Sequence, residues 1–338
     1  MPELLFSILS RNEENGVQFY YADYNVIKSI KPEDYDYERN TTKINLPLII
    51  KKPEDKYRNI ILDSCKGLVC FTIGHEGLDD PVCICNPATS EYISLPTIRN
   101  KTGFLVNGFG YLPSTKEYKV VRILYPDRLH HPDYATAGWV QVYTLGSSSG
   151  WRNIAAITDS LWDNGTLVNG VLYWRDDKDE NIIAFDLADE VFRVLPPLPC
   201  IRPKNRYYTL RNLGGYLSWT DQVWDERIDM WLFKKNKHET RQNNVEQSEQ
   251  NYYHDWSWNK EVTINRVEAT GNLNFYYPFD PFALTKNNEV LLWYSDTNLL
   301  CYDPVTRSFT AVVKDNTDFG LFQGIPHVNN HASLKDLG

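Results

Sequence analysis

The sequence lacks the features that mark membrane, exported and nucleic-acid-binding proteins. No stretch approaches the roughly 18 consecutive apolar residues that a transmembrane helix requires. The apolar run near the N-terminus is too short and too interrupted for a signal peptide. Positive charge is scarce, because 35 Lys and Arg residues face 44 Asp and Glu residues and the formal net charge is −9. Since binding to a phosphate backbone needs a dense basic face, we expect neither nucleic acid nor a membrane as a partner.

Cysteine is sparse, and the six residues fall in apolar, strand-like segments: Cys65, Cys70, Cys83, Cys85, Cys200 and Cys301. Thiols of this kind, in a chain without an export signal, are typical of a reducing compartment and of burial as small apolar side chains. We therefore predict a cytoplasmic and/or nuclear protein. Cys83 and Cys85 share one face of a predicted strand. A zinc site usually needs a second pair or a Cys/His complement, so core packing is the preferred interpretation.

Motifs of several common enzyme classes are absent. The sequence contains no GxGxxG, P-loop or HExxH pattern, and no calcium loop with a central Gly and a terminal Glu. The adjacent His130 and His131 lie near Asp127 and Asp133, where metal binding is conceivable, but a solvated polar loop is the preferred interpretation. We therefore predict no catalytic residue, no metal site and no cofactor.

Aromatic residues are abundant by contrast, with 22 Tyr, 14 Phe and 10 Trp. Such side chains suit a pleated, half-buried surface, which favours β structure. A short apolar burst recurs along the chain. In four copies it ends in an aromatic residue that we expect in the core: Phe71, Trp174, Trp219 and Trp293.

A second repeated pattern follows these bursts and predicts a β-hairpin. Its clearest copies span residues 82–96, 182–196 and 299–313. In each copy an apolar strand leads to an Asn or Asp, whose side-chain oxygen can accept a hydrogen bond from the backbone downstream and so stabilise a turn. The return strand then carries an aromatic residue at a fixed offset from the turn.

The spacing of these units indicates the architecture. It brackets the roughly 40–50 residues of a propeller blade, little of the sequence has a helical period, and a β-sandwich would not explain why one hairpin sequence recurs. We predict an all-β, kelch-like β-propeller over residues 1–318, with about six blades and with five to seven compatible. Residues 319–338 are expected to form a C-terminal tail that is partly frayed.

Three aromatic residues lie instead in polar, loop-like stretches: Trp162, Trp224 and Tyr134. An aromatic side chain is costly to leave in water and is useful at the centre of an interface. We expect these three residues, together with Arg128 and Arg227, to form part of a partner-binding face.

Several short motifs occur in a fixed order along most of the chain. They include DSCKGLVCF at 63–71, NPAT at 86–89, GFGY at 108–111, KEYKVVR at 116–122 and NGVLYW at 169–174. Together they resemble the plant F-box-associated domain of F-box/kelch-like and S-locus F-box proteins. Nothing before Leu4 resembles the F-box that precedes this domain in the family.

The resemblance implies a domain that captures a target protein. When coupled to an F-box, it would act as the substrate receptor of an SCF-type (cullin-RING) ubiquitin ligase, with a Skp-type adaptor and a cullin as further partners, and without enzyme activity of its own. Two alternatives remain. A lectin-like propeller would stack exposed Trp and Tyr on sugars, and a kelch-like enzyme would need a Tyr/Cys/His metal set that the sequence does not supply.

Overall fold

The computed structural model describes residues 3–10, 17–31, 34–46, 50, 60–73, 80–98, 103–126, 137–176, 181–199, 207–236, 253–266, 273–295, 298–313, 319–330 and 333–334. Two short helices, α1 (Tyr24–Ser29) and α2 (Tyr37–Asn40), accompany the strands. Within these ranges no helix has both the length and the apolarity to span a membrane.

The first twelve strands are β1 (Glu3–Ser10), β2 (Gln18–Asp23), β3 (Thr42–Ile44), β4 (Ile61–Cys65), β5 (Leu68–Thr72), β6 (Val82–Asn86), β7 (Glu91–Ser94), β8 (Phe104–Leu112), β9 (Glu117–Tyr125), β10 (Gly138–Thr144), β11 (Arg152–Ile157) and β12 (Leu161–Val168). The remaining strands are β13 (Val171–Asp176), β14 (Ile182–Asp186), β15 (Phe192–Val194), β16 (Tyr207–Leu213), β17 (Tyr216–Val223), β18 (Arg227–Lys235), β19 (Trp256–Asn265), β20 (Phe279–Leu284), β21 (Val290–Tyr294), β22 (Asn298–Asp303), β23 (Ser308–Val313) and β24 (Phe319–His327).

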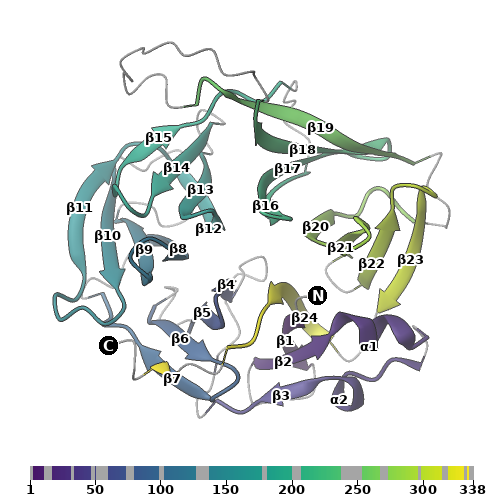
Figure 1. Ribbon diagram of the computed structural model, residues 1–338, viewed down its shortest axis with the longest axis horizontal. Helices are drawn as coiled ribbons and strands as arrows, with labels where there is room; N and C mark the ends of the chain where they lie inside the picture. The colour runs from purple at the N-terminus through teal and green to yellow at the C-terminus, as the bar shows by residue number, and fades with distance from the viewer. Residues whose placement is uncertain are drawn as a thin grey trace.

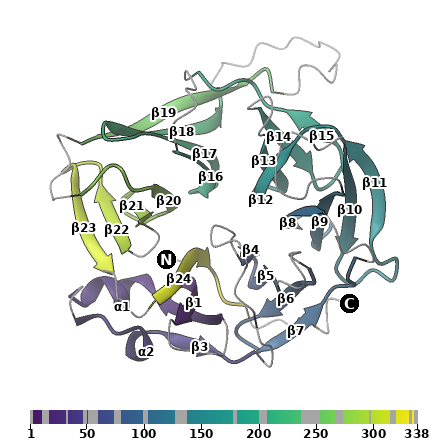
Figure 2. The same cartoon turned by 180° about the vertical axis from the view of Figure 1, so that it is seen from behind.

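These strands form four-stranded antiparallel units arranged in a ring (Figures 1 and 2). Four units are separate sheets, with strand orders β24-β1-β2-β3, β4-β5-β6-β7, β16-β17-β18-β19 and β20-β21-β22-β23. The other strands form one eight-stranded sheet, in which β8–β11 and β12–β15 meet through the first strand of each. The predicted all-β propeller is confirmed.

Two glycines allow the close approach inside the eight-stranded sheet. The inner strands β8 and β12 run parallel and pair only at Gly108 and Gly165. A Cβ on Gly165 would lie 2.6 Å from the indole ring of Trp174, and one on Gly108 would lie 2.8 Å from the same ring. Because real Cβ contacts are longer, a side chain at either position would push the buried indole or the strand aside.

The hairpins form through the turn chemistry that the sequence predicts. After β6, the side-chain Oδ1 of Asn86 accepts a hydrogen bond from the N–H of Ala88 at 3.0 Å. Asp186 at the end of β14 and Asp303 at the end of β22 each accept one from the residue two positions on, both at 2.8 Å. Each turn then closes with a residue of positive φ four positions after the acceptor: Ser90, Glu190 and Arg307. One local geometry is therefore used three times around the ring.

The core lies between neighbouring units. Phe71, Trp174, Trp219 and Trp293 are all buried, with at most 6% of the side-chain surface exposed. Cys83 and Cys85 are fully buried and pack with Val69 and Phe71. Both sequence interpretations, aromatic core and packed thiols, are confirmed for these residues.

The C-terminal residues differ from the expected frayed tail. Residues 319–327 form β24, which pairs along the length of β1 from Glu3↔His327 to Ser10↔Phe319. Beyond the strand, the amide of Asn86 donates to the carbonyl of Asn330 at 2.8 Å, and Leu334 is buried in the core between the β4–β7 and β8–β11 units. The expectation was wrong for these residues because the strand is held by pairing with β1 at the other end of the chain, which no local sequence pattern records.

Candidate functional site

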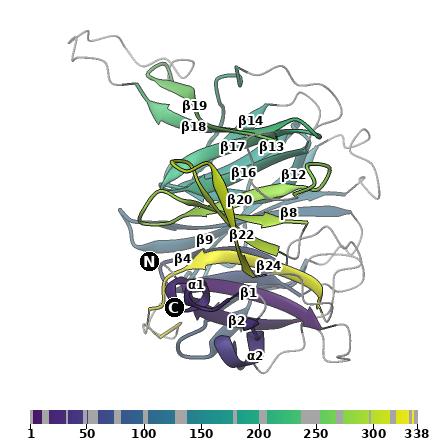
Figure 3. The same ribbon diagram turned by 90° about the vertical axis from the view of Figure 1, so that its right-hand side faces the viewer.

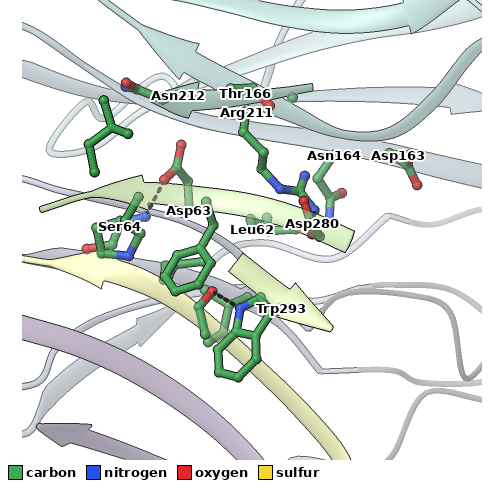
Figure 4. Close-up of a pocket in the computed structure, with 18 of the residues that line it drawn as sticks. Leu62, Asp63, Ser64, Asp163, Asn164, Thr166, Arg211, Asn212, Asp280 and Trp293 are labelled. Carbon is green, nitrogen blue, oxygen red and sulfur yellow. Dashed lines mark hydrogen bonds and ion pairs between the residues drawn. The ribbon is translucent and has the colours of Figure 1, made fainter. Parts of the chain in front are cut away.

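A cavity of about 460 Å³ runs between the inner strands of the ring. Its walls come from β4, β12, β16, β20 and β24, together with Trp293 of β21 (Figure 4). The innermost strand of a propeller unit faces the axis, so polar side chains from units far apart in sequence converge here. Those that carry charge are Asp63, Asp163, Arg211 and Asp280.

An ion pair joins two units across the cavity wall. The Nη2 of Arg211 on β16 donates to Oδ2 of Asp280 on β20 at 2.6 Å, and its Nη1 donates to the carbonyl of Leu210 at 3.2 Å. Burial disfavours the guanidinium charge, but the Asp280 carboxylate outweighs that effect and raises the pKa of Arg211. Arg211 is therefore a fixed positive charge that is already matched by Asp280.

Asp63 on β4 is held mainly by backbone groups, in contrast to the ion-paired Arg211 and Asp280. Its carboxylate accepts a hydrogen bond from the backbone N–H of Ser64 at 2.6 Å. Burial raises the pKa of Asp63 to about 7, although the Ser64 and Leu167 backbone groups and the nearby Arg211 act in the opposite direction. This carboxyl group therefore changes charge near neutral pH.

A serine and a histidine meet at the edge of the cavity. Ser64 Oγ lies 2.7 Å from Nδ1 of His327, and His327 Nε2 lies 3.0 Å from Oδ1 of Asn329. Burial lowers the pKa of His327, an effect that the Asn329 hydrogen bond partly offsets. The imidazole is buried and is oriented by an amide, whereas a catalytic Ser-His pair usually has a carboxylate in that place. We therefore interpret these contacts as structural hydrogen bonds that hold β4 and β24 together. Within the described part of the chain, no three His, Cys, Asp or Glu residues gather closely enough to hold a metal.

The structure places three of the five residues predicted for partner binding. Trp162 lies in β12, where we expected a loop, and stacks on Phe104 with ring centroids 5.1 Å apart. Trp224 lies in the turn between β17 and β18, with its ring 6.1 Å from that of Tyr207. Arg227 begins β18. Tyr134 and Arg128 fall outside the described residues.

Arg227 is engaged within its own unit. Its Nε donates to Oδ2 of Asp229 at 3.1 Å, and Nη1 forms an ion pair with Glu226. The Asp229 hydrogen bond raises the pKa of Arg227, although burial acts the other way. Arg227 is only partly exposed, so it stabilises the start of β18 as well as presenting charge at the surface.

Trp162 and Trp224 lie on the same face of the ring. Thr166 of β12 donates its hydroxyl to the carbonyl of Leu210, and the amide of Asn212 donates to the carbonyl of Leu167. Successive contacts therefore advance in the same direction along both strands, which means that β12 and β16 run parallel. Their first residues, beside which the two tryptophans lie, consequently share one face.

Two exposed tyrosines on this face were not predicted. Tyr276 is 62% exposed and Tyr277 is 48% exposed, in the connection between β19 and β20. We call Tyr207, Trp224, Tyr276 and Tyr277 the aromatic rim. The only sequence feature that could have indicated them is that two tyrosines precede Pro278. Because aromatic residues are also frequent in the strands of this chain, the pair could not be distinguished from core residues.

A buried glutamine holds the tyrosine segment in place. The Nε2 of Gln222 donates to the carbonyls of Phe275 at 3.0 Å and Tyr277 at 2.8 Å, and its Oε1 accepts from the N–H of Phe279 at 3.0 Å. Phe275 itself is 1% exposed and anchors the segment in the core. The rim is therefore ordered before any partner binds.

Comparison with known proteins gives a consistent result. A family model described as the F-box associated beta propeller domain matches residues 19–322. F-box protein At3g07870 of Arabidopsis thaliana is 27% identical over 304 residues, covering 79% of this chain and 67% of that protein. F-box protein At1g47340 of the same plant is 30% identical over 253 residues, covering 69% of this chain and 50% of that protein. The matched region is thus about half to two thirds of the length of these two relatives.

Solved structures are more distant. An oligogalacturonate lyase in complex with manganese aligns with a TM-score of 0.48 at 8% identity, covering 88% of this chain and 71% of the lyase. A likeness at this level carries no argument about function.

Proposed function

This chain belongs to the F-box associated β-propeller domain family, and from that premise we propose that it is the target-recognition domain of an SCF-type ubiquitin ligase. The observation that carries the proposal is the family match over 19–322, together with relatives that are named F-box proteins. In this role the domain performs no chemistry. It holds a target protein so that a separate enzyme can modify the target's lysines, which raises their effective concentration at that enzyme.

An F-box would supply the link to the ligase. In the proposed arrangement the F-box docks onto a Skp-type adaptor and a cullin, and the propeller contacts only the target. The two activities are then separable: the propeller determines which protein is captured, and the F-box determines whether the captured protein is modified.

The aromatic rim is the surface that we assign to the target, with Trp162 and Arg227 beside it. Tyr and Trp side chains supply large contact areas at a low entropic cost, and they are enriched where interfaces concentrate their binding energy. Gln222 holds the tyrosine segment before binding, which lowers the cost of ordering the surface. Tyr134 and Arg128 remain predicted members of this face.

The test compares two ends of the same unit. The chain, with an F-box fused ahead of it, is used to capture proteins from plant extract, and captured proteins are identified by mass spectrometry. The double variant Trp224→Ala with Tyr276→Ala should lose the target. Tyr216→Ala is the matched control, because Tyr216 is 45% exposed but follows the turn at the opposite end of β16.

Two controls complete the design. Each variant should melt within a few degrees of the parent chain, since Tyr276 and Tyr216 are exposed and Trp224 lies in a turn where it is only partly buried. The chain without the F-box should capture the same target but no adaptor. If the double variant still captures the target, the aromatic rim is not the target-binding surface. Binding to a glycan array without any protein partner would favour the lectin-like alternative over the proposed function.

A further inference from the structure

Charged side chains from four propeller units line the central cavity. Three carboxylates, on Asp63, Asp163 and Asp280, face one guanidinium, on Arg211, and the four residues come from four different units. Arg211 is matched to Asp280 by the 2.6 Å ion pair. Among the described residues, no Lys or Arg side chain forms an ion pair with Asp63, which instead accepts hydrogen bonds from backbone groups.

The rest of the lining suits a small organic group. The volume of about 460 Å³ lies within the range of small-molecule sites. Trp293 forms part of one wall, where its indole N–H donates to the carbonyl of Gly324 at 3.2 Å and its ring stacks on Phe282. Asn164 and Asn212 add amide groups to the lining. An aromatic wall combined with carboxylates is the chemistry that recognises organic cations.

We propose that the central cavity binds an organic cation, an alkylguanidinium or alkylammonium group, which pairs with Asp63 and packs against Trp293. The cation could be a free small molecule or the side chain of an Arg or Lys residue that enters from a bound protein. The site does not depend on the proposed function, because it is defined by the cavity of the isolated chain.

The proposal includes a defined dependence on pH. A bound cation favours the ionised form of Asp63, whose pKa is about 7 because of burial, so binding releases a proton near neutrality. The apparent affinity should therefore rise roughly tenfold between about pH 6 and pH 8, as the ionised fraction of a group with this pKa rises by about that factor. Among the described residues, the charged or titratable groups around Asp63 include Arg211 on β16, Asp163 on β12, Asp280 on β20 and His327 on β24. Two thiols, those of Cys65 and Cys70, also lie near enough to interact with its charge, and burial raises the pKa of both, so they stay neutral. The pKa of His327 is lowered, so its imidazole stays largely uncharged above its ordinary pKa of 6.5.

The experiment uses a pair of probes that differ in charge but little in shape. Butylguanidinium is cationic, and butylurea is its neutral counterpart. Each is titrated into the intact chain by isothermal calorimetry at about pH 6 and about pH 8, with the fluorescence of Trp293 and the other indoles as a second readout. We expect saturable binding of butylguanidinium that tightens with pH, and binding of butylurea at least roughly tenfold weaker, as expected when a charge-assisted contact is replaced by a neutral one.

Two substitutions of the same chemical type then locate the site. Asp63→Asn should weaken butylguanidinium binding roughly tenfold or more at pH 8 and should abolish its pH dependence. Asp34→Asn is the matched control, because Asp34 is exposed and lies outside the cavity, and it should change neither quantity. The proposal is overturned if butylguanidinium does not bind, if butylurea binds equally well, or if Asp63→Asn binds like the parent chain.

A second pair of probes distinguishes the two sources of the cation. A capped Gly-Arg-Gly peptide and its citrulline analogue are compared with butylguanidinium. Tighter binding of the Arg peptide indicates a protein side chain, and tighter binding of butylguanidinium indicates a free small molecule. Because these probes require no target protein, failure of the cavity proposal leaves the capture experiment intact, and failure of capture leaves this one intact.

Discussion

Replacing Asp63 by Asn should stabilise the fold, by an amount that increases with pH. The pKa of this carboxyl rises from an ordinary value of 3.8 to about 7 because burial disfavours its charge. Below pH 3.8, the ordinary pKa, both the folded and the unfolded chain bind the proton, so the ionisation of Asp63 does not affect the free energy of unfolding. As pH rises from there towards 7, the unfolded chain releases the proton and the folded chain does not, so stability falls.

The magnitude follows from these two pKa values. A tenfold difference in proton affinity corresponds to about 1.4 kcal/mol, so the interval from 3.8 to about 7 sets an upper limit of about 4 kcal/mol on the cost of Asp63 at pH 8. An Asn side chain is neutral, and its oxygen can still accept from the N–H of Ser64. Because the site relaxes around a charge, we expect the measured gain for Asp63→Asn to be about 1–3 kcal/mol at pH 8 and near zero at about pH 4.

The assay is urea unfolding of the parent chain and of Asp63→Asn at about pH 4.5, 6 and 8, with intrinsic tryptophan fluorescence as the signal. Asp34→Asn, at an exposed site, serves as the control and should show little pH-dependent change. A stability difference for Asp63→Asn that stays the same from pH 4.5 to pH 8 would refute the reasoning, since it would show that Asp63 ionises equally easily in both states.

Three further predictions concern the framework around the site. Gly165→Ala should destabilise the fold by about 1–3 kcal/mol, measured by urea unfolding, because the new Cβ would overlap the indole of Trp174; an unchanged midpoint would contradict the tight packing. Gln222→Leu should weaken target capture more than Tyr216→Ala does, because it removes all three hydrogen bonds that hold the exposed tyrosines; equal capture would show that the segment is held by other contacts. Glu91→Gln should increase hydrogen exchange at the N–H of Leu334, which donates to this carboxylate at 2.8 Å, and unaltered exchange would mean that the amide is protected in another way.

The sequence predicts the repeated parts of this fold well because their causes are local. Asn86 and Asp303 bond the backbone two residues downstream, and such a turn can be inferred from the residue type and the following Pro. The buried Trp174 and Trp219 follow from apolar bursts of strand length. None of these inferences requires knowledge of which strands become neighbours.

The cavity and the ring closure could not be predicted because their causes are not local. Asp63 and Arg211 are ordinary polar residues in the sequence, and they acquire a role only when β4 and β16 face the same axis. The pairing of β24 with β1 joins residues at opposite ends of the chain, and no periodicity links Glu3 to His327. Trp162 was placed in a loop because its polar neighbours Asp163 and Asn164 suggested one, whereas these residues occupy the irregular part of an inner strand.

The closure of the ring also fixes the direction in which the chain enters it. Glu3 pairs with His327, which contacts Ser64 just before the β4–β5 turn, and Tyr118 joins that turn to the β8–β9 end of the next unit through a 3.1 Å hydrogen bond. Glu3 and His327 therefore lie on the face opposite the aromatic rim, at paired ends of β1 and β24, which run side by side in the side view of Figure 3. An inner strand of nine residues, such as β8, spans about 30 Å. A module fused ahead of Glu3 would then be separated from a protein held at the rim by the full thickness of the ring, so the propeller would act as a rigid spacer of fixed length between the two.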